Sequence, residues 1–323
     1  MKRKFIRIMY VVTPVMLVLL LALNVFTIFK VKALEESAGG DETEDVAQEN
    51  DVTIGGEYVI KATTQISDAY KSGNTSNLSD KDKETLSMAK SVLDEIIADG
   101  MSDYEKELAV YKWMTTNIGF DSGSMTVIPE DESKPVDNPN GVLKNHEAVC
   151  VGYATTFRLF MQMLGIDCMV VHDSYLSHSW DLVKLDGQWY HTDIYSDAGS
   201  STGNFSHFNL NDEMMNSQEW NTDFFPAADG YKYNYAYMNR TQCKDVYTIP
   251  EQMRAALDAR QGVVSLDFGK DVSDDIYNLA DTIMNSVENT VNAGYGVSFS
   301  WSWLEAGDDN VFCVYINYEK TED

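Results

Sequence analysis

The chain has 323 residues, of which 51 are acidic and 24 are basic, and its formal net charge at pH 7 is −27. Phosphate backbones repel so acidic a protein, which argues against a nucleic-acid or polyanion partner and permits a cationic one. The length allows one or two domains besides any N-terminal segment.

The first 33 residues have the pattern of a membrane anchor or a secretory signal. Four basic residues within the first seven precede residues 8–29, a stretch of 22 residues without a charge. That is long enough to span a bilayer as a helix, although Val31-Lys32-Ala33 also resembles a signal cleavage site. We favour the uncleaved anchor, and in either case we expect the chain beyond the basic flank to be exported. The protein would be held in the cell membrane with an extracellular domain, or secreted if the segment is cleaved.

An acidic segment follows. Residues 34–51 contain eight acids and no base, a composition typical of solvated, disordered chain. We expect residues 34–78 to be a linker between the membrane and a domain, with one short strand signal at 58–61.

Two helices are predicted next. Ser79 can cap a helix that Gly100 ends, and Ser102 with Glu105 forms a capping-box pattern for a second helix that ends at Gly119. Apolar residues recur at helical spacing in both. We expect these helices to support the site without adding chemistry.

A cysteine stands at the start of a third predicted helix. Residues 122–140 are rich in Pro, Asp, Ser and Gly and predict an exposed loop that leads to it. From Val151 the apolar side chains have helical spacing, and Gly165 stops the helix. Cys150 therefore lies at the helix N-terminus, where the dipole and unpaired N–H groups favour a reactive thiolate. A buried structural cysteine is the alternative reading of a lone Cys.

A histidine and an aspartate belong to the hairpin that follows. Two apolar runs, Ser179–Leu185 and residues 188–194, flank Asp186-Gly187, which predicts a two-residue turn. Pairing across this turn makes His178 and Asp193 diagonal neighbours on one face, about 7–8 Å apart at the backbone. A carboxylate there can orient an imidazole and stabilise its protonated form.

The remainder of the chain has two further patterns. Residues 204–237 are rich in aromatic residues and Asn, which more often cover the edge of a core than line a groove. Residues 241–323 predict a small C-terminal α+β appendage of unassigned role, with strands at 262–268, 296–304 and 311–318 and a helix at 274–292.

Other cysteines and histidines leave two alternatives open. Cys168 lies in an apolar run and is predicted to be a core residue, whereas Cys243 and Cys313 could form a disulfide outside the cell. Zinc is a minor alternative to thiol chemistry, although the spacing is not that of a compact zinc motif. Its ligands would be Cys150, His172, His178 and His191.

Two motifs carry a family resemblance. The first is Ala148-Val149-Cys150-Val151-Gly152-Tyr153-Ala154. The second is His178-Ser179-Trp180-Asp181, followed after one apolar strand by Asp186-Gly187-Gln188-Trp189-Tyr190 and then by Asp193. Together they resemble the transglutaminase-like superfamily, whose core is that of papain-like cysteine enzymes. The family more often has Asn at position 181 and Gly at position 148, so this chain departs from the pattern at both.

The resemblance covers residues 79–240 and implies an α+β fold, in which helices pack on an antiparallel sheet. It implies that Cys150 is the nucleophile, His178 the general base and acid, and Asp193 the orienting carboxylate, without a metal or a cofactor. The backbone N–H of Cys150 would be the first oxyanion donor. Asn145 and His146 are candidates for a side-chain donor, but the sequence does not decide between them.

These observations predict an exported thiol enzyme that acts on peptide or carboxamide bonds of a protein or peptide substrate. Its acyl-enzyme would pass to water, as in a peptidase or amidase, or to an amine, as in a cross-linking transglutaminase. The same triad serves both outcomes, and we favour hydrolysis because water is always present. The alternative is a non-catalytic binding or scaffold module at the cell surface that retains the fold.

Overall fold

The structure is a computed structural model of the chain. It describes residues 52–54, 58–60, 62–120, 135–175, 177–198, 203–270, 272–291, 296–306 and 309–318. The predicted anchor at residues 8–29 lies outside these ranges. Among the helices that the structure does describe, none has the length and apolar character needed to cross a membrane.

The first described elements are a small hairpin and a helix. Strand β1 (Val52–Ile54) pairs antiparallel with β2 (Tyr58–Ile60), and helix α2 (Thr64–Ser72) follows. Residues 64–72 belong to the segment predicted as a linker, so the expectation of open chain does not hold for them. Ile66 and Ala69 of α2 are buried in the main hydrophobic core. Their i, i+3 spacing is a helical signal, but it is too short to be decisive without the surface on which it packs.

Both predicted supporting helices are present with their predicted caps. Helix α3 (Asp80–Ile96) begins where the Ser79 side chain accepts a hydrogen bond from the backbone N–H of Asp82. Helix α4 (Asp103–Asn117) begins with the capping box of Ser102 and Glu105. Helix α3 ends before Gly100, because the residue after it, Ile97, is already extended.

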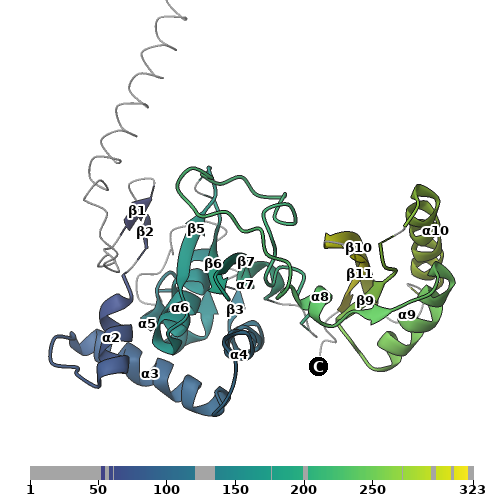
Figure 1. The fold of residues 1–323 in the computed structure, drawn as a ribbon. Helices are drawn as coiled ribbons and strands as arrows, with labels where there is room; N and C mark the ends of the chain where they lie inside the picture. The colour runs from purple at the N-terminus through teal and green to yellow at the C-terminus, as the bar shows by residue number, and fades with distance from the viewer. Residues whose placement is uncertain are drawn as a thin grey trace, which may run out of the picture. The chain divides into compact units, whose positions relative to one another are not determined.

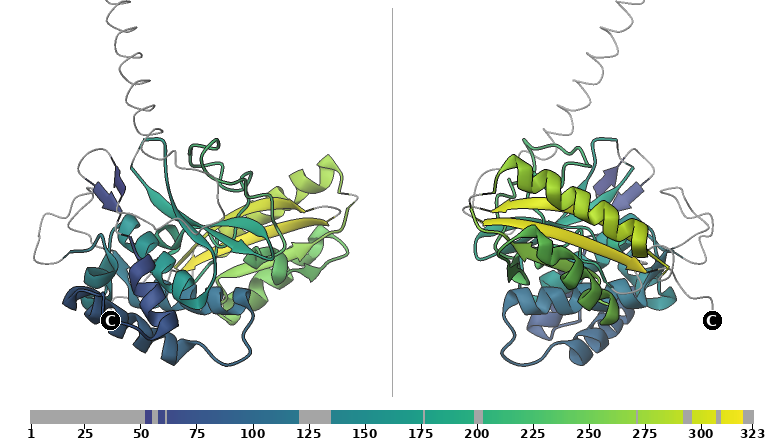
Figure 2. Two further views of the ribbon diagram at one scale, coloured as in Figure 1. Left: turned by 60° about the vertical axis from the view of Figure 1, so that its left-hand side comes forward. Right: turned by 90° about the vertical axis from the view of Figure 1, so that its right-hand side faces the viewer.

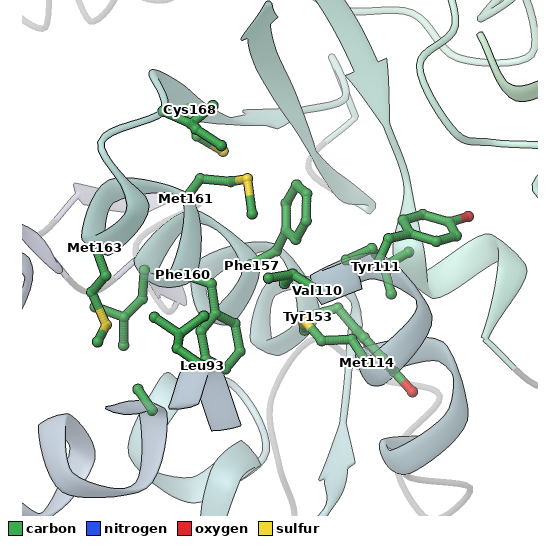
Figure 3. Close-up of a cluster of buried hydrophobic side chains, with 14 of the residues drawn as sticks. Leu93, Val110, Tyr111, Met114, Tyr153, Phe157, Phe160, Met161, Met163 and Cys168 are labelled. Atoms are coloured by element: carbon green, nitrogen blue, oxygen red, sulfur yellow. The ribbon is translucent and has the colours of Figure 1, made fainter. Parts of the chain in front are cut away.

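Helix α6 (Cys150–Leu164) lies at the centre of the main core. Gly165 ends it in the left-handed conformation, with a φ of 78°. Nearly all of its side chains are buried, and Figure 3 shows several of them beside side chains of α3 and α4. Helix α5 (Pro139–Asn145) packs against the same helix. A helix buried on every side can hold its first residue in a fixed position, which matters for Cys150.

A three-stranded antiparallel sheet packs on α6 (Figure 1). Its order is β5 (Cys168–His172), β6 (Ser179–Leu185) and β7 (Gln188–Thr192). The register pairs Leu185 with Gln188 and Asp181 with Thr192, as the Asp-Gly turn predicts. Strand β7 is shorter than predicted, since Asp193 caps helix α7 (Ile194–Asp197) by accepting from the Ser196 N–H.

Two short strands, β3 (Gly119–Phe120) and β4 (Glu147–Ala148), pair in parallel and tie the end of α4 to the start of α6. The fold of this part of the chain is thus α+β, with helices packed on an antiparallel sheet.

The C-terminal region has a sheet and a hydrophobic core of its own. The sheet order is β10 (Val297–Ala306), β11 (Asp309–Tyr318), β9 (Val263–Asp267) and β8 (Thr241–Gln242). Helices α9 (Ile249–Asp258) and α10 (Asp274–Val291) lie across one face of the long strands (Figure 2). Short helices α8 (Tyr235–Met238) and η1 (Val246–Thr248) precede α9.

The strands and the long helix of this region agree with the predicted appendage, whereas α9 was not predicted. Pro250 in its first turn is a helix-start signal that sequence reasoning passed over. Cys243 and Cys313 are both free thiols, so the suggested disulfide between them is wrong.

Candidate active site

Cys150 is the first residue of α6 and is 8% exposed. Its position depends on a close approach of two backbone segments. The N–H of Val149 donates to the carbonyl oxygen of Val136 at 3.1 Å, and a Cβ added to Gly152 would lie 2.0 Å from that same oxygen. Only glycine permits this approach, which explains the Gly of the Cys-Val-Gly-Tyr-Ala motif.

His178 and Asp193 meet as the hairpin register predicts. The ring nitrogen Nε2 of His178 donates to Oδ2 of Asp193 at 2.7 Å. The Asp193 side chain is buried, while the imidazole is partly exposed. Because the N–H group at Nε2 is hydrogen-bonded to Asp193, Nδ1 is the ring nitrogen that can exchange a proton with a thiol.

Electrostatics favours the imidazolium form of His178. Burial lowers the pKa of His178, but hydrogen bonds with Asp193 and with Cys150 outweigh it and raise the pKa to about 10. Burial raises the pKa of Asp193, but the hydrogen bond and charge of His178, the hydrogen bond from Ser196 and the charge of His207 together outweigh it, so that the pKa of this carboxyl lies below its ordinary value. The imidazole therefore lies between the thiol and an ionised carboxylate.

Aromatic rings enclose the imidazole. The ring of Trp180 stacks on His178 with centroids 5.8 Å apart, and the ring of Tyr195 lies 5.6 Å away. Trp180 is the second residue of β6, and His178 directly precedes this strand. Sequence reasoning gave no role to either aromatic residue.

A buried aspartate holds the backbone just before β6. Asp173 accepts hydrogen bonds from the N–H groups of Ser177 and His178, at 2.6 and 3.0 Å, and from the Ser177 hydroxyl. These bonds fix the residue from which the imidazole projects. Asp173 was missed because its partners become neighbours only when the loop after β5 folds back.

A second histidine–carboxylate pair lies behind Asp193. The backbone N–H of Asp193 donates to the carbonyl oxygen of His207 at 2.9 Å. Nδ1 of His207 donates to Asp197 at 2.8 Å, and Asp197 also accepts from the hydroxyls of Ser206 and Tyr111. Although burial lowers the pKa of His207, the Asp197 carboxylate raises it above the ordinary value. The pair anchors the short helix that Asp193 caps.

Asp181 replaces the Asn that is more usual in the motif. Its side chain is 1% exposed and accepts from the Cys168 thiol at 3.5 Å. Burial raises the pKa of Asp181 well above its ordinary value. Cys168 is a core residue, as predicted, and burial likewise raises its thiol pKa.

The side chains suggested as oxyanion donors make other contacts. Nδ2 of Asn145 lies 3.5 Å from the carbonyl oxygen of Pro135. Nδ1 of His146 lies 3.2 Å from the carbonyl oxygen of Asn117. Of the predicted donors, the backbone N–H of Cys150 belongs to a candidate catalytic residue itself.

Two of the four side chains named for the zinc alternative make other contacts. His191 receives a hydrogen bond from the Trp180 indole at Nδ1, and its Nε2 donates to Asp212; both distances are 2.9 Å. His172 packs its ring against Phe225. No cluster of three or more metal-ligating side chains occurs among the residues that the structure describes.

Comparisons with known proteins agree with these motifs. A sequence model described as the Transglutaminase-like superfamily matches residues 90–194, a range that contains all three predicted site residues. The comparison with curated proteins finds no match.

Two solved structures are similar to part of the chain. One, described as a TGase, is 19% identical over 39% of this chain and 36% of its own, with a TM-score of 0.29. The other, described as a "Putative Cysteine Protease" from Cytophaga hutchinsonii, is 16% identical over 34% and 37%, with a TM-score of 0.26. The similarity spans just over a third of the length of each. Residues 90–194 therefore match a domain of the transglutaminase-like superfamily.

Proposed function

We propose that the chain is a thiol acyl-transfer enzyme in which Cys150, His178 and Asp193 form the catalytic triad. The observation that carries the proposal is the continuous contact of the three groups: His178 is hydrogen-bonded to both Cys150 and Asp193. The pair of Cys150 and His178 supplies a nucleophile and its proton partner, and Asp193 fixes the ring.

In the proposed reaction the Cys150 thiolate attacks the carbonyl carbon of a peptide or carboxamide bond. The backbone N–H of Cys150 stabilises the oxyanion of the tetrahedral intermediate. Protonated His178 gives its proton to the leaving amine as the carbon–nitrogen bond breaks, which leaves a thioester on Cys150. Neutral His178 then takes a proton from the acyl acceptor, and the thioester is cleaved.

Water or an amine can be this acceptor, and the triad serves both. We propose hydrolysis of a protein or peptide substrate, because water is the acceptor present under all conditions. Incubation with a labelled primary amine and a glutamine-containing protein distinguishes the outcomes. Release of ammonia without incorporated amine indicates an amidase, new amino termini indicate a peptidase, and incorporated amine indicates cross-linking.

Export across the membrane belongs to the proposal on sequence grounds alone. The uncharged residues 8–29 behind a basic flank support it. Mass spectrometry of the N-terminus of native protein tests the anchor, since a chain that starts at Leu34 has been cleaved and contradicts it.

Selective alkylation of Cys150 at about pH 6 tests the triad. At this pH an ordinary thiol with a pKa near 8.5 is almost wholly protonated and reacts slowly. We expect iodoacetamide to modify Cys150 faster than the half-exposed Cys243, although Cys150 is the more buried of the two. Mapping by mass spectrometry gives both rates within one sample.

A pair of histidine variants completes the test. His178→Ala should remove the excess reactivity of Cys150, because the thiolate loses the imidazolium that stabilises it. His172→Ala is the matched control, since His172 is also half-buried but contacts Phe225 instead of the thiol. Equal rates for Cys150 and Cys243, or no effect of His178→Ala, would contradict the proposed triad and favour a non-catalytic binding module.

A further inference from the structure

A polar cavity of about 600 Å³ lies away from the triad, beside α8 and the start of β9. Its lining comes from distant parts of the sequence, among them Lys112 on α4, Phe205, Tyr235 on α8 and Arg260 just after α9. Figure 1 shows α8 next to the C-terminal sheet. None of the three triad residues lines the cavity, and the proposed acyl-transfer chemistry leaves it without a role.

The charge of this cavity is opposite to that of the chain. Lys112 and Arg260 line it, and none of the described residues in the lining is Asp or Glu, in a sequence with 51 acids and 24 bases. Within the described ranges neither cation forms an ion pair. Each instead lies over an aromatic ring: Nζ of Lys112 is 5.5 Å from the Phe205 centroid, and Cζ of Arg260 is 4.8 Å from the Tyr318 centroid. Both charges are exposed and are available to an anion.

One residue of the cavity lining has an unused hydrogen-bonding group. Ser265 of β9 lines the cavity and is 6% exposed. Its hydroxyl oxygen is buried and has no hydrogen-bond partner in the part of the chain that the structure describes. Native proteins rarely leave a buried hydroxyl without a partner, so a group supplied by a ligand would satisfy it.

Residues with an unfavourable backbone conformation also line this cavity. Five described residues other than glycine have positive φ, and two of them, Phe205 at 54° and Arg260 at 48°, line the cavity. Arg260 follows Ala259, the C-cap residue of α9, and glycine is the usual choice for left-handed backbone at this position. An arginine there costs backbone energy, which a role for its side chain would explain.

We propose that the cavity binds a small organic anion through a phosphate or carboxylate group. Lys112 and Arg260 supply the positive charge, and the Ser265 hydroxyl donates a hydrogen bond. The rings of Phe205 and Tyr235 stack with their centroids 3.9 Å apart. They offer an apolar surface to the part of the ligand that carries no charge. The volume lies within the range of small-molecule sites.

Isothermal titration calorimetry of the full-length protein in a non-ionic detergent tests the site. The probes are inorganic phosphate and the dicarboxylate glutarate. We expect at least one probe to bind, with an affinity that falls as the salt concentration rises because the contacts are exposed. Binding of phosphate alone assigns a phosphate ligand, and binding of glutarate alone assigns a carboxylate. No heat from either probe up to about 20 mM would overturn the proposal, since such binding lies beyond the millimolar range.

Charge-matched variants locate the binding. Lys112→Gln and Arg260→Asn should each weaken it about tenfold or more, because each removes a charge-assisted contact. Asn tolerates left-handed backbone, so Arg260→Asn preserves the helix end. Lys244→Gln and Arg254→Gln remove the same charges from exposed residues outside this cavity and should leave binding unchanged. Equal losses in the control variants, or none in Lys112→Gln, would contradict the site. Circular dichroism checks that the variants fold. If Arg260→Asn unfolds, the test rests on Lys112→Gln alone.

Discussion

Glu107 is a buried carboxyl group beneath the candidate active site. It lies on α4 and is 0% exposed. Its Oε1 accepts a hydrogen bond from the Thr192 hydroxyl at 3.3 Å, and its Oε2 accepts from Nδ2 of Asn209 at 2.9 Å. Thr192 is the last residue of β7, directly before Asp193. The carboxyl thus supports the strand end that carries the orienting aspartate.

Burial makes this support dependent on pH. It raises the pKa of Glu107 from 4.5 to about 8, even though both hydrogen bonds lower it. Between these two pH values the folded protein keeps a proton that the unfolded chain has lost. The unfolded state then binds fewer protons, so the free energy of unfolding falls as the pH rises. The loss accumulates at about 1.4 kcal/mol per pH unit and reaches about 3 kcal/mol at pH 7.

Glu107→Gln removes this cost and keeps the contacts. The amide group of glutamine can donate to the Thr192 hydroxyl, which then donates to Oδ1 of Asn209, 3.1 Å away. Its carbonyl oxygen still accepts from Nδ2 of Asn209. We expect the variant to gain up to about 3 kcal/mol in the free energy of unfolding at pH 7 and almost nothing at pH 4.5.

Urea unfolding followed by tryptophan fluorescence, at several values from pH 4.5 to pH 8, measures the difference between variant and parent. Glu95→Gln is the control, because it removes an exposed carboxylate from α3 and should change stability little at any pH. The reasoning is refuted if Glu107→Gln follows the same pH dependence as the parent, or if it is less stable at pH 7.

Two further substitutions test the support of the triad. Asp193→Ala should slow alkylation of the candidate nucleophile at about pH 6 by tenfold or more, since the imidazolium loses its counter-charge. Ser196→Ala removes only the hydrogen bond that the Ser196 hydroxyl donates to that carboxylate, and the backbone N–H bond remains. It should have a smaller effect, so equal rates in both variants would contradict the orienting role. Gly152→Ala should lower the free energy of unfolding by about 3 kcal/mol or more, because the new Cβ would lie 2.0 Å from the Val136 carbonyl oxygen. Gly165→Ala meets no atom within 4 Å and should cost only about 1 kcal/mol for its left-handed backbone; a similar loss in both glycine variants, measured by urea unfolding, would exclude the close approach as the cause.

Local interactions made several elements predictable from sequence alone. The caps at Ser79 and Ser102 act within one helical turn, so the residues that form them are close together in the sequence. The Asp186-Gly187 turn fixes the hairpin register, which brings His178 and Asp193 together. Because strand alternation carries the register along the hairpin, two residues 15 positions apart could be placed on one face without a structure.

Contacts between distant segments were not predictable in this way. Strand β7 stops at Thr192 because Asp193 turns to cap α7 while its N–H bonds to the carbonyl of His207. Helix α2 is stabilised by the burial of Ile66 in the main hydrophobic core.

The sequence by itself determined the chemical types of the proposed triad and their places on local elements. Only the tertiary structure decided which groups surround them. Glu107 and the cation-lined cavity beside β9 each depend on residues that are far apart in the chain. Burial and charge at a site sum over all neighbouring segments, and a sequence lists only the neighbours along the backbone.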